Sequence, residues 1–195
     1  MGSISAEEPV NGQVNGKTTA VAGLKSFPTT RPAIRIKCGL SGQFPCGSIY
    51  TGSTLVGVPL SWGTLESVGD FEPKLNLKLT NGHDWFRIDA DKQHGRLSVS
   101  AIATDEEGRS IRLIADGVTE LNEYTMPLIL GDPNAKTNPF GYGVEQMRFE
   151  AGHDVYKPLE NMMFACSQRF AKDDETGAPM AEIRVSQIVP GSGFE

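Results

Sequence analysis

We select six residues as candidates for chemistry on a small molecule. Their side chains are carboxylates, a phenol, a guanidinium and an indole, which are kinds that bind and transform such molecules. The six residues are Asp84, Trp85, Asp116, Tyr142, Arg148 and Glu150. A carboxylate that loses part of its hydration in a cavity has a raised pKa and exchanges protons near neutral pH. An indole ring offers a flat wall to an unsaturated ligand. We therefore expect a shared pocket, with Asp84, Glu150 and Tyr142 catalytic and Trp85, Asp116 and Arg148 binding the substrate.

The positions of these residues favour one end of the fold. Asp84 and Trp85 follow the turn-like pair Asn81-Gly82 after a single residue, His83. Tyr142 ends a long polar connection, residues 131–143, of the kind that often forms a lid or a binding loop. A merely mobile connection is the alternative for this loop, and a core position is the alternative for Trp85.

The inward or outward direction of the charged residues stays open at this stage. Arg148 and Glu150 share one face of an alternating segment, and Met147 and Phe149 share the other. Such charges would line a polar cavity if they faced inward. The exterior is the more common place for them.

Familiar catalytic and metal-binding motifs are absent from the sequence. It contains no GxGxxG, no Walker A loop, no GxSxG elbow, no HExxH and no CxxC. His83-Asp84 and His153-Asp154 each combine a nitrogen with a carboxylate, but their turn-like positions favour solubility and turn chemistry over a metal site. We therefore expect neither a cofactor nor a metal.

Composition limits the partners and the compartment. The chain has 195 residues, a net charge of −6 and no basic cluster, which argues against binding to nucleic acid or to anionic membranes. No apolar run reaches the ~20 residues that span a bilayer.

The cysteines and the N-terminus bear on the compartment. Three cysteines are an odd number, which favours a reducing compartment, and the N-terminus has no signal-like apolar segment. These features predict a cytoplasmic protein. Homo-oligomerisation stays open. A Cys38–Cys46 bridge is one alternative, and free buried thiols are the favoured one.

Alternation of apolar and polar residues predicts an all-β domain. Ile34 to Leu40 reads as a half-buried strand, and Asn81-Gly82 reads as the two-residue turn of a hairpin. Two more hairpins are expected from residues 96–104 with 109–118 and from 162–170 with 181–189. Further strands are expected at 48–57, 58–66, 120–130 and 143–150.

These elements predict a small antiparallel β-barrel of about ten strands, because closure removes exposed strand edges. Residues 1–30 are rich in Gly, Asn, Thr, Ser and Glu and contain few apolar side chains. Such a segment cannot bury enough apolar area to offset its ordering entropy. We expect residues 1–30 to be a disordered tail and residues 31–195 to form the barrel.

Several short motifs, in order, resemble an uncharacterised β-barrel family, domain of unknown function 3237. The stretch from His94 to Gly117 is similar to the family's central hairpin, and Gly82-His83-Asp84-Trp85 resembles its Gly-x-Asp-Trp turn. Downstream, Arg148-Phe149-Glu150-Ala151-Gly152, Leu159-Glu160-Asn161 and Phe164-Ala165-Cys166 resemble further family segments. The resemblance covers roughly residues 35–190. Val99-Ser100-Ala101 departs from the family's Ala-Arg-Tyr, and the family's Trp is missing before Leu159.

The resemblance implies a barrel with an interior of ligand size, similar to accessory proteins of fungal natural-product pathways. One hypothesis is a cofactor-independent cyclase, isomerase or lyase that acts on an apolar polyketide or terpenoid intermediate of secondary metabolism. The alternative is a non-catalytic barrel that binds a small apolar metabolite or supports a partner enzyme. Acidic or basic groups with shifted pKa values inside the barrel would favour catalysis.

Overall fold

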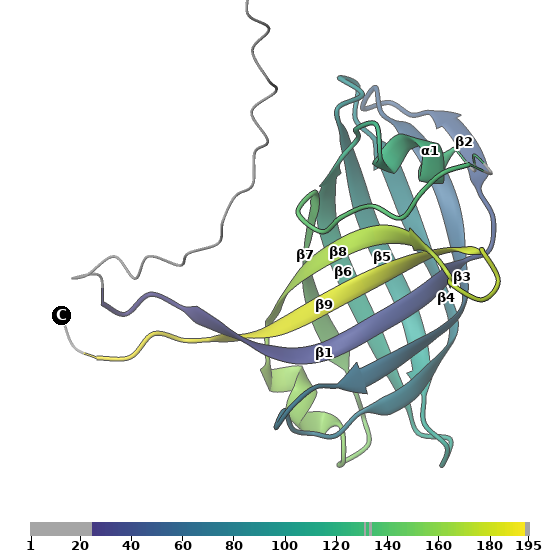
Figure 1. Ribbon diagram of the computed structural model, residues 1–195. Helices are drawn as coiled ribbons and strands as arrows, with labels where there is room; N and C mark the ends of the chain where they lie inside the picture. Colours follow the sequence, from purple (N-terminus) through teal and green to yellow (C-terminus); the bar gives the residue numbers. More distant parts are fainter. Residues whose placement is uncertain (1–24, 131, 133, 194–195) are drawn as a thin grey trace, which may run out of the picture.

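Apolar side chains at every second position give most strands one buried face. The strands curve around into a barrel (Figure 1). The computed structural model describes residues 25–130, 132 and 134–193. The strands are β1 (Thr29–Leu40), β2 (Phe44–Ser48), β3 (Thr54–Ser67), β4 (Asn76–Ile88), β5 (His94–Thr104), β6 (Ser110–Glu120), β7 (Gly143–Glu150), β8 (Phe164–Lys172) and β9 (Pro179–Val189). Two short helices are α1 (Thr125–Ile129) and the 3₁₀ helix η1 (Lys157–Asn161).

Antiparallel pairing closes eight of the strands into a ring. The sheet order is β1-β9-β8-β7-β6-β5-β4-β3-β2, and β1 also pairs with β3 from Ile34↔Ser67 to Leu40↔Leu60. β2 is the ninth strand and pairs with the first part of β3, beyond the point where β1 ends. The all-β antiparallel barrel expected from the sequence is therefore confirmed.

The domain boundary was expected after residue 30. Residues 1–24 of that expected tail lie outside the described residues, and β1 begins at Thr29.

Two of the expected hairpins are confirmed: β5 with β6, and β8 with β9. The division into strands at 48–57 and 58–66 is wrong, because β3 continues through Pro59. β1 has ended beside that position, so the absence of an N–H on Pro59 breaks no pairing there.

The strand expected at 120–130 is also wrong. The Asn122 side chain accepts hydrogen bonds from the backbone N–H groups of Tyr124 and Thr125, and α1 follows.

The hairpin expected at Asn81-Gly82 is wrong as well. β4 continues through both residues, and its pairing with β5 shifts by one residue between Leu79 and Asn81, which is a β-bulge. Gly82 pairs with Ala101, and a Cβ at Gly82 would lie 2.5 Å from the Ala101 Cβ. Glycine is needed here for close packing of two strands rather than for a turn.

The bulge changes which residues of β4 face inward. Leu77 and Leu79 are buried before it, and Asp84 and Phe86 are buried after it. Leu79 and Asp84 are five positions apart, so strict alternation would put them on opposite faces. The extra residue in the bulge puts both inside the barrel.

The two ends of the barrel differ. At one end, called the closed end, the Phe164 ring packs edge-on against Phe71 and Phe149, and Leu159 of η1 is buried beside this cluster. At the other end, called the open end, α1 lies across the mouth near β2 (Figure 1). Neither helix in the described part of the chain has the length and apolar character needed to span a bilayer.

The described part of the connection 131–143 is fastened to the rest of the fold by hydrogen bonds and a ring contact. The Asn138 backbone N–H donates to the Phe170 carbonyl, and its side-chain amide donates to Thr125 Oγ1 at 3.0 Å. The Phe140 ring lies 4.8 Å from the Arg169 guanidinium carbon and 5.4 Å from that of Arg184. These contacts join the connection to α1, β8 and β9.

We expect Gly82→Val to destabilise the barrel by ~1–3 kcal/mol, because the new Cβ would collide with the Ala101 methyl inside the β4–β5 pairing. The midpoint of urea unfolding measures the effect. Gly152→Val is the control, because a Cβ at Gly152 meets nothing within 4 Å. An unchanged midpoint for Gly82→Val would contradict the close packing of β4 on β5.

Candidate functional site

Asp84 is a buried carboxylate on the inner face of β4. It is 6% exposed, and its Oδ1 accepts a hydrogen bond from the Ser98 backbone N–H at 2.8 Å. The pairing of β4 with β5 is interrupted at Trp85 and Phe86, so the carboxylate takes up a β5 donor there. Burial raises the pKa of Asp84 to about 6, although the Ser98 N–H and the Arg87 charge act in the opposite direction.

Glu145 is a second buried carboxyl group, on the inner face of β7. It is 8% exposed, and its side chain lies over Gly117 of β6, where a Cβ would be only 2.5 Å from the Glu145 Cγ. Burial, together with the negative charges of Asp84 and Asp116, raises the pKa of Glu145 to about 8. At neutral pH, Glu145 is therefore mostly protonated and Asp84 mostly ionised.

Both carboxyl groups line a narrow cavity of about 40 Å³ in the middle of the barrel. Most of its other lining residues are apolar, among them Leu97, Leu113 and Met147. Two acidic groups in one apolar cavity with separated pKa values are a combination that can donate a proton at one atom and accept a proton at another.

A larger chamber of about 360 Å³ lies between this cavity and the open end. Its size is in the range of pockets that hold small molecules. Asp84, Leu40 and Phe170 line both spaces, so Asp84 lies where they adjoin. The remaining lining of the chamber is mainly apolar and includes Val56, Val58 and Phe86.

α1 covers this chamber. Leu128, Ile129 and Leu130 line it from the side of the helix, and Gly42 and Gln43 line it from the connection between β1 and β2. The Gln43 side-chain amide donates a hydrogen bond to the Ile129 carbonyl. This contact joins the two segments that border the chamber.

The six residues expected in one pocket do not all come together. Trp85 is 43% exposed on the outer face of β4, where its ring lies 5.5 Å from that of His83. Tyr142 lies outside both cavities and stacks on Tyr124 with ring centroids 6.1 Å apart. Of the six, only Asp84 lines the interior spaces.

Asp116, Arg148 and Glu150 lie on the outer face of the barrel. Asp116 and Arg148 border a small surface depression, and Glu150 forms an ion pair with Arg112 at 3.0 Å. Arg148 and Glu150 therefore face outward, which was the exterior alternative, because Met147 and Phe149 occupy the inner face of β7.

Sequence reasoning missed Glu145, although a signal was present. Glu145 has the same parity as Met147 and Phe149, so it is a charged residue on the apolar face of an alternating strand. A charged side chain rarely occupies such a face without a partner or a function. For Asp84 the corresponding signal was hidden by the bulge.

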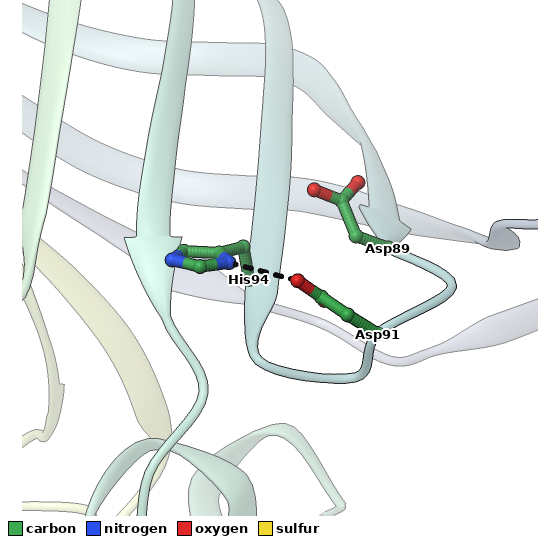
Figure 2. Close-up of side chains that lie close together, drawn as sticks. All are labelled: Asp89, Asp91 and His94. Carbon is green, nitrogen blue, oxygen red and sulfur yellow. Dashed lines mark hydrogen bonds and ion pairs between the residues drawn. The ribbon is translucent and has the colours of Figure 1, made fainter.

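Three potential metal ligands meet at the β4–β5 turn (Figure 2). The Asp91 Oδ2 lies 3.3 Å from His94 Nδ1, and Asp89 forms an ion pair with Arg96 at 2.9 Å. Asp91 also accepts the Gln93 backbone N–H, as in many tight turns. These contacts explain the cluster as turn structure.

The pair His83-Asp84 cannot supply two ligands to one ion. Adjacent residues of a strand point to opposite faces, so His83 lies outside the barrel against Trp85 while Asp84 is inside.

Glu145→Gln should remove a pH dependence of stability. Because the folded-state pKa of Glu145 is raised from 4.5 to about 8, the folded chain holds a proton that the unfolded chain releases between these values. Stability therefore falls as pH rises through this window, by up to about 1.4 kcal/mol per pH unit.

Urea unfolding at several pH values from 7 to 9 measures this slope where Asp84, with a pKa of about 6, is mostly ionised. Glu145→Gln should flatten it. Glu66→Gln, on the exposed outer face of β3, should keep the wild-type slope. Equal slopes in the wild type and Glu145→Gln would contradict the burial of an ionisable Glu145.

Known proteins share this architecture. A conserved protein of unknown function from Rhodopseudomonas palustris is similar with a TM-score of 0.67 and 19% identity, over 83% of this chain and 98% of that chain. A β-barrel-like protein from Acinetobacter baumannii has a TM-score of 0.60 and 16% identity, over 83% and 96%. An enzyme from Penicillium herquei has a TM-score of 0.54 and 11% identity, over 86% and 99%.

Sequence identities this low show that the three structures are similar to this chain in fold alone. No curated protein matches the sequence. The model of one protein family, described as a protein of unknown function (DUF3237), matches residues 28–188, which is nearly the whole barrel. The chain therefore belongs to the DUF3237 family.

Proposed function

We propose that this protein is a cofactor-independent isomerase or cyclase that acts on a neutral, largely apolar small molecule. The observation that carries the proposal is the pair of buried carboxyl groups, Asp84 and Glu145, in an apolar cavity that adjoins a ligand-sized chamber. Of the six residues expected from the sequence the proposal retains Asp84, and it adds Glu145.

Each carboxyl group has one role in the proposed reaction. Glu145, protonated at neutral pH, donates a proton to one atom of the substrate, and the Asp84 carboxylate removes a proton from another. One proton enters the substrate and one leaves, so an isomerisation or cyclisation balances without an oxidant or reductant. Exchange of protons with solvent returns both groups to their starting states.

The barrel would contribute to the rate by excluding water and fixing the groups. Asp84 is held by the Ser98 N–H, and Glu145 is fixed over Gly117 by close packing. Groups that are fixed in advance in an apolar site interact strongly with charge that develops in the transition state. Residues of the chamber near α1 would hold the apolar body of the substrate.

The biological setting is part of the proposal. We infer a polyketide or terpenoid intermediate of fungal secondary metabolism as the substrate, and the cytoplasm as the compartment. The similarly folded protein from the fungus Penicillium herquei is described as an enzyme, so in that protein this architecture accompanies catalysis.

A non-catalytic binding barrel is the second candidate. The lining of the larger chamber favours it, because Val56, Val58, Phe86 and the α1 residues would hold an apolar molecule without any proton transfer. Under this alternative, the interior carboxyl groups affect the outcome of the pathway no more than exterior ones do.

Asp84→Asn and Glu145→Gln should separate the two candidates. Each variant is expressed in a strain from which the gene for this protein has been deleted. Either variant should leave an unrearranged precursor and lower product formation by ~10²-fold or more, because each removes one proton-transfer group. Metabolite profiling measures the precursor and the product. Glu66→Gln, which changes an exposed carboxylate on the outer face of β3, should restore the wild-type profile. Wild-type product levels with both interior variants would refute the proton-transfer mechanism and leave the binding barrel.

The pH dependence of turnover gives an independent test, with the accumulated precursor as substrate. Activity should fall below about pH 6, where Asp84 is protonated and no longer a base, and above about pH 8, where Glu145 loses its acidic proton. The residual activity of Glu145→Gln should lack the decline above pH 8. A wild-type profile that is flat from pH 5 to 9 would contradict the assignment.

A further inference from the structure

A third polar side chain lines the narrow cavity beside the two carboxyl groups. Gln168 on the inner face of β8 is 2% exposed. Its side chain lies across Gly143 of β7, where a Cβ would be 2.7 Å from the Gln168 Cγ and 3.0 Å from its Nε2. The Gln168 amide can occupy this space because residue 143 is a glycine.

The amide nitrogen of Gln168 has no hydrogen-bond partner among the described residues. A buried donor without a partner costs ~1–3 kcal/mol, and folded proteins contain few of them. Two further unpartnered polar atoms belong to Asn122 and Asn138, outside both interior spaces. Gln168 is thus an unsatisfied donor in the same cavity as the proposed acid and base.

Strand register puts this donor close to Glu145. Glu145 pairs with Cys166, and Gly143 pairs with Gln168, so Glu145 and Gln168 are diagonal neighbours on the inner face of β7 and β8. Diagonal neighbours on antiparallel strands are within reach of each other's long side chains. The protonated carboxyl group of Glu145 and the amide of Gln168 then both offer hydrogens within one small space.

The charges in this cavity exclude an anionic ligand. Its described lining residues include Asp84 and Glu145 but no lysine or arginine. A carboxylate or a phosphate would have to lie beside the Asp84 charge without a compensating cation, which is strongly unfavourable in an apolar surrounding. The group that suits two donors here is an uncharged oxygen acceptor.

We propose that Gln168 binds the carbonyl oxygen of a neutral carbonyl compound, with the apolar body of the ligand in the chamber beneath α1. This inference rests on the proposed function for its setting and names the substrate class of that site. The narrow cavity of about 40 Å³ receives the oxygen, and the chamber of about 360 Å³ receives the body. Asp84, where the two spaces adjoin, then faces the carbon next to the carbonyl.

This orientation specifies a proton-transfer step. Asp84 removes the proton from the carbon next to the carbonyl, and the electron pair of that C–H bond forms a carbon–carbon double bond. The carbonyl π electrons move to oxygen, which receives the Glu145 proton while the Gln168 N–H donates a hydrogen bond to it. The resulting enol is the intermediate from which a shifted double bond or a closed ring forms.

Binding of two matched probes tests the carbonyl site without any turnover. 2-Acetylnaphthalene and 2-ethylnaphthalene have nearly the same shape and differ in the carbonyl oxygen. The wild type should bind the ketone more tightly than the hydrocarbon, as measured by ligand-observed NMR titration. Gln168→Met should lower the ketone affinity by about three- to tenfold and leave the hydrocarbon affinity unchanged, because one neutral hydrogen bond is lost.

Gln146→Met is the matched control, since Gln146 lies on the outer face of β7. It should keep the wild-type ratio of the two affinities. In the absence of ligand, Gln168→Met should have a melting temperature equal to or above that of the wild type, because it removes an unpartnered buried donor. A marked fall in melting temperature would identify Gln168 as a structural residue and overturn the proposal.

An unchanged ketone-to-hydrocarbon ratio in Gln168→Met, or no binding of either probe to the wild type, would also overturn the carbonyl site. These outcomes differ from failure of the proposed function. Ketone selectivity that depends on Gln168, together with full product formation by Asp84→Asn and Glu145→Gln, would refute proton transfer and leave a carbonyl-binding barrel.

Discussion

The β-bulge between Leu79 and Asn81 is the constraint on which the interior of this barrel depends. Side chains of a strand alternate between two faces, so one extra residue reverses the face of every residue that follows it. Without the bulge, Asp84 would be at the surface and the large Trp85 ring would be inside. With it, Asp84 enters the cavity and Phe86 continues the apolar lining. Gly82 allows this arrangement, because any Cβ there would collide with Ala101.

Burying Asp84 and Glu145 is unfavourable, and the barrel as a whole must offset that cost. Ionised carboxylates lose hydration energy in an apolar interior, which is why both pKa values are raised. The stability comes from elsewhere: closure of eight strands and the aromatic cluster at the closed end, where Phe164 contacts Phe71 and Phe149. One end of the molecule thus supplies packing, and the other, beneath α1, is left hollow and polar at its base. Proteins commonly offset unfavourable groups at a functional site by stability elsewhere in the fold.

Glycines shape the polar part of the interior as much as the polar residues do. Gly117 leaves room for the Glu145 side chain, and Gly143 leaves room for Gln168. Each is the neighbour on an adjacent strand, so the space is created by pairing and is absent from any single strand. The result is a narrow cavity in which two hydrogen donors and one carboxylate lie close together among apolar side chains.

The sequence was sufficient to predict the all-β class, the strand at Ile34–Leu40 and two hairpins, because alternation and turn residues are local signals. It also contained Asp84 as a candidate and the parity that makes Glu145 unusual. It did not determine which residues meet. Asn81-Gly82 is locally a strong hairpin signal, yet pairing of β4 with β5 on one side and β3 on the other kept the chain extended through it. Whether Arg148 and Glu150 faced in or out depended on closure of the ring, which gave the inner face of β7 to Met147 and Phe149. The surroundings of the unpartnered Gln168 amide depend on residues more than twenty positions away, such as Gly143, which come together only when the strands pair.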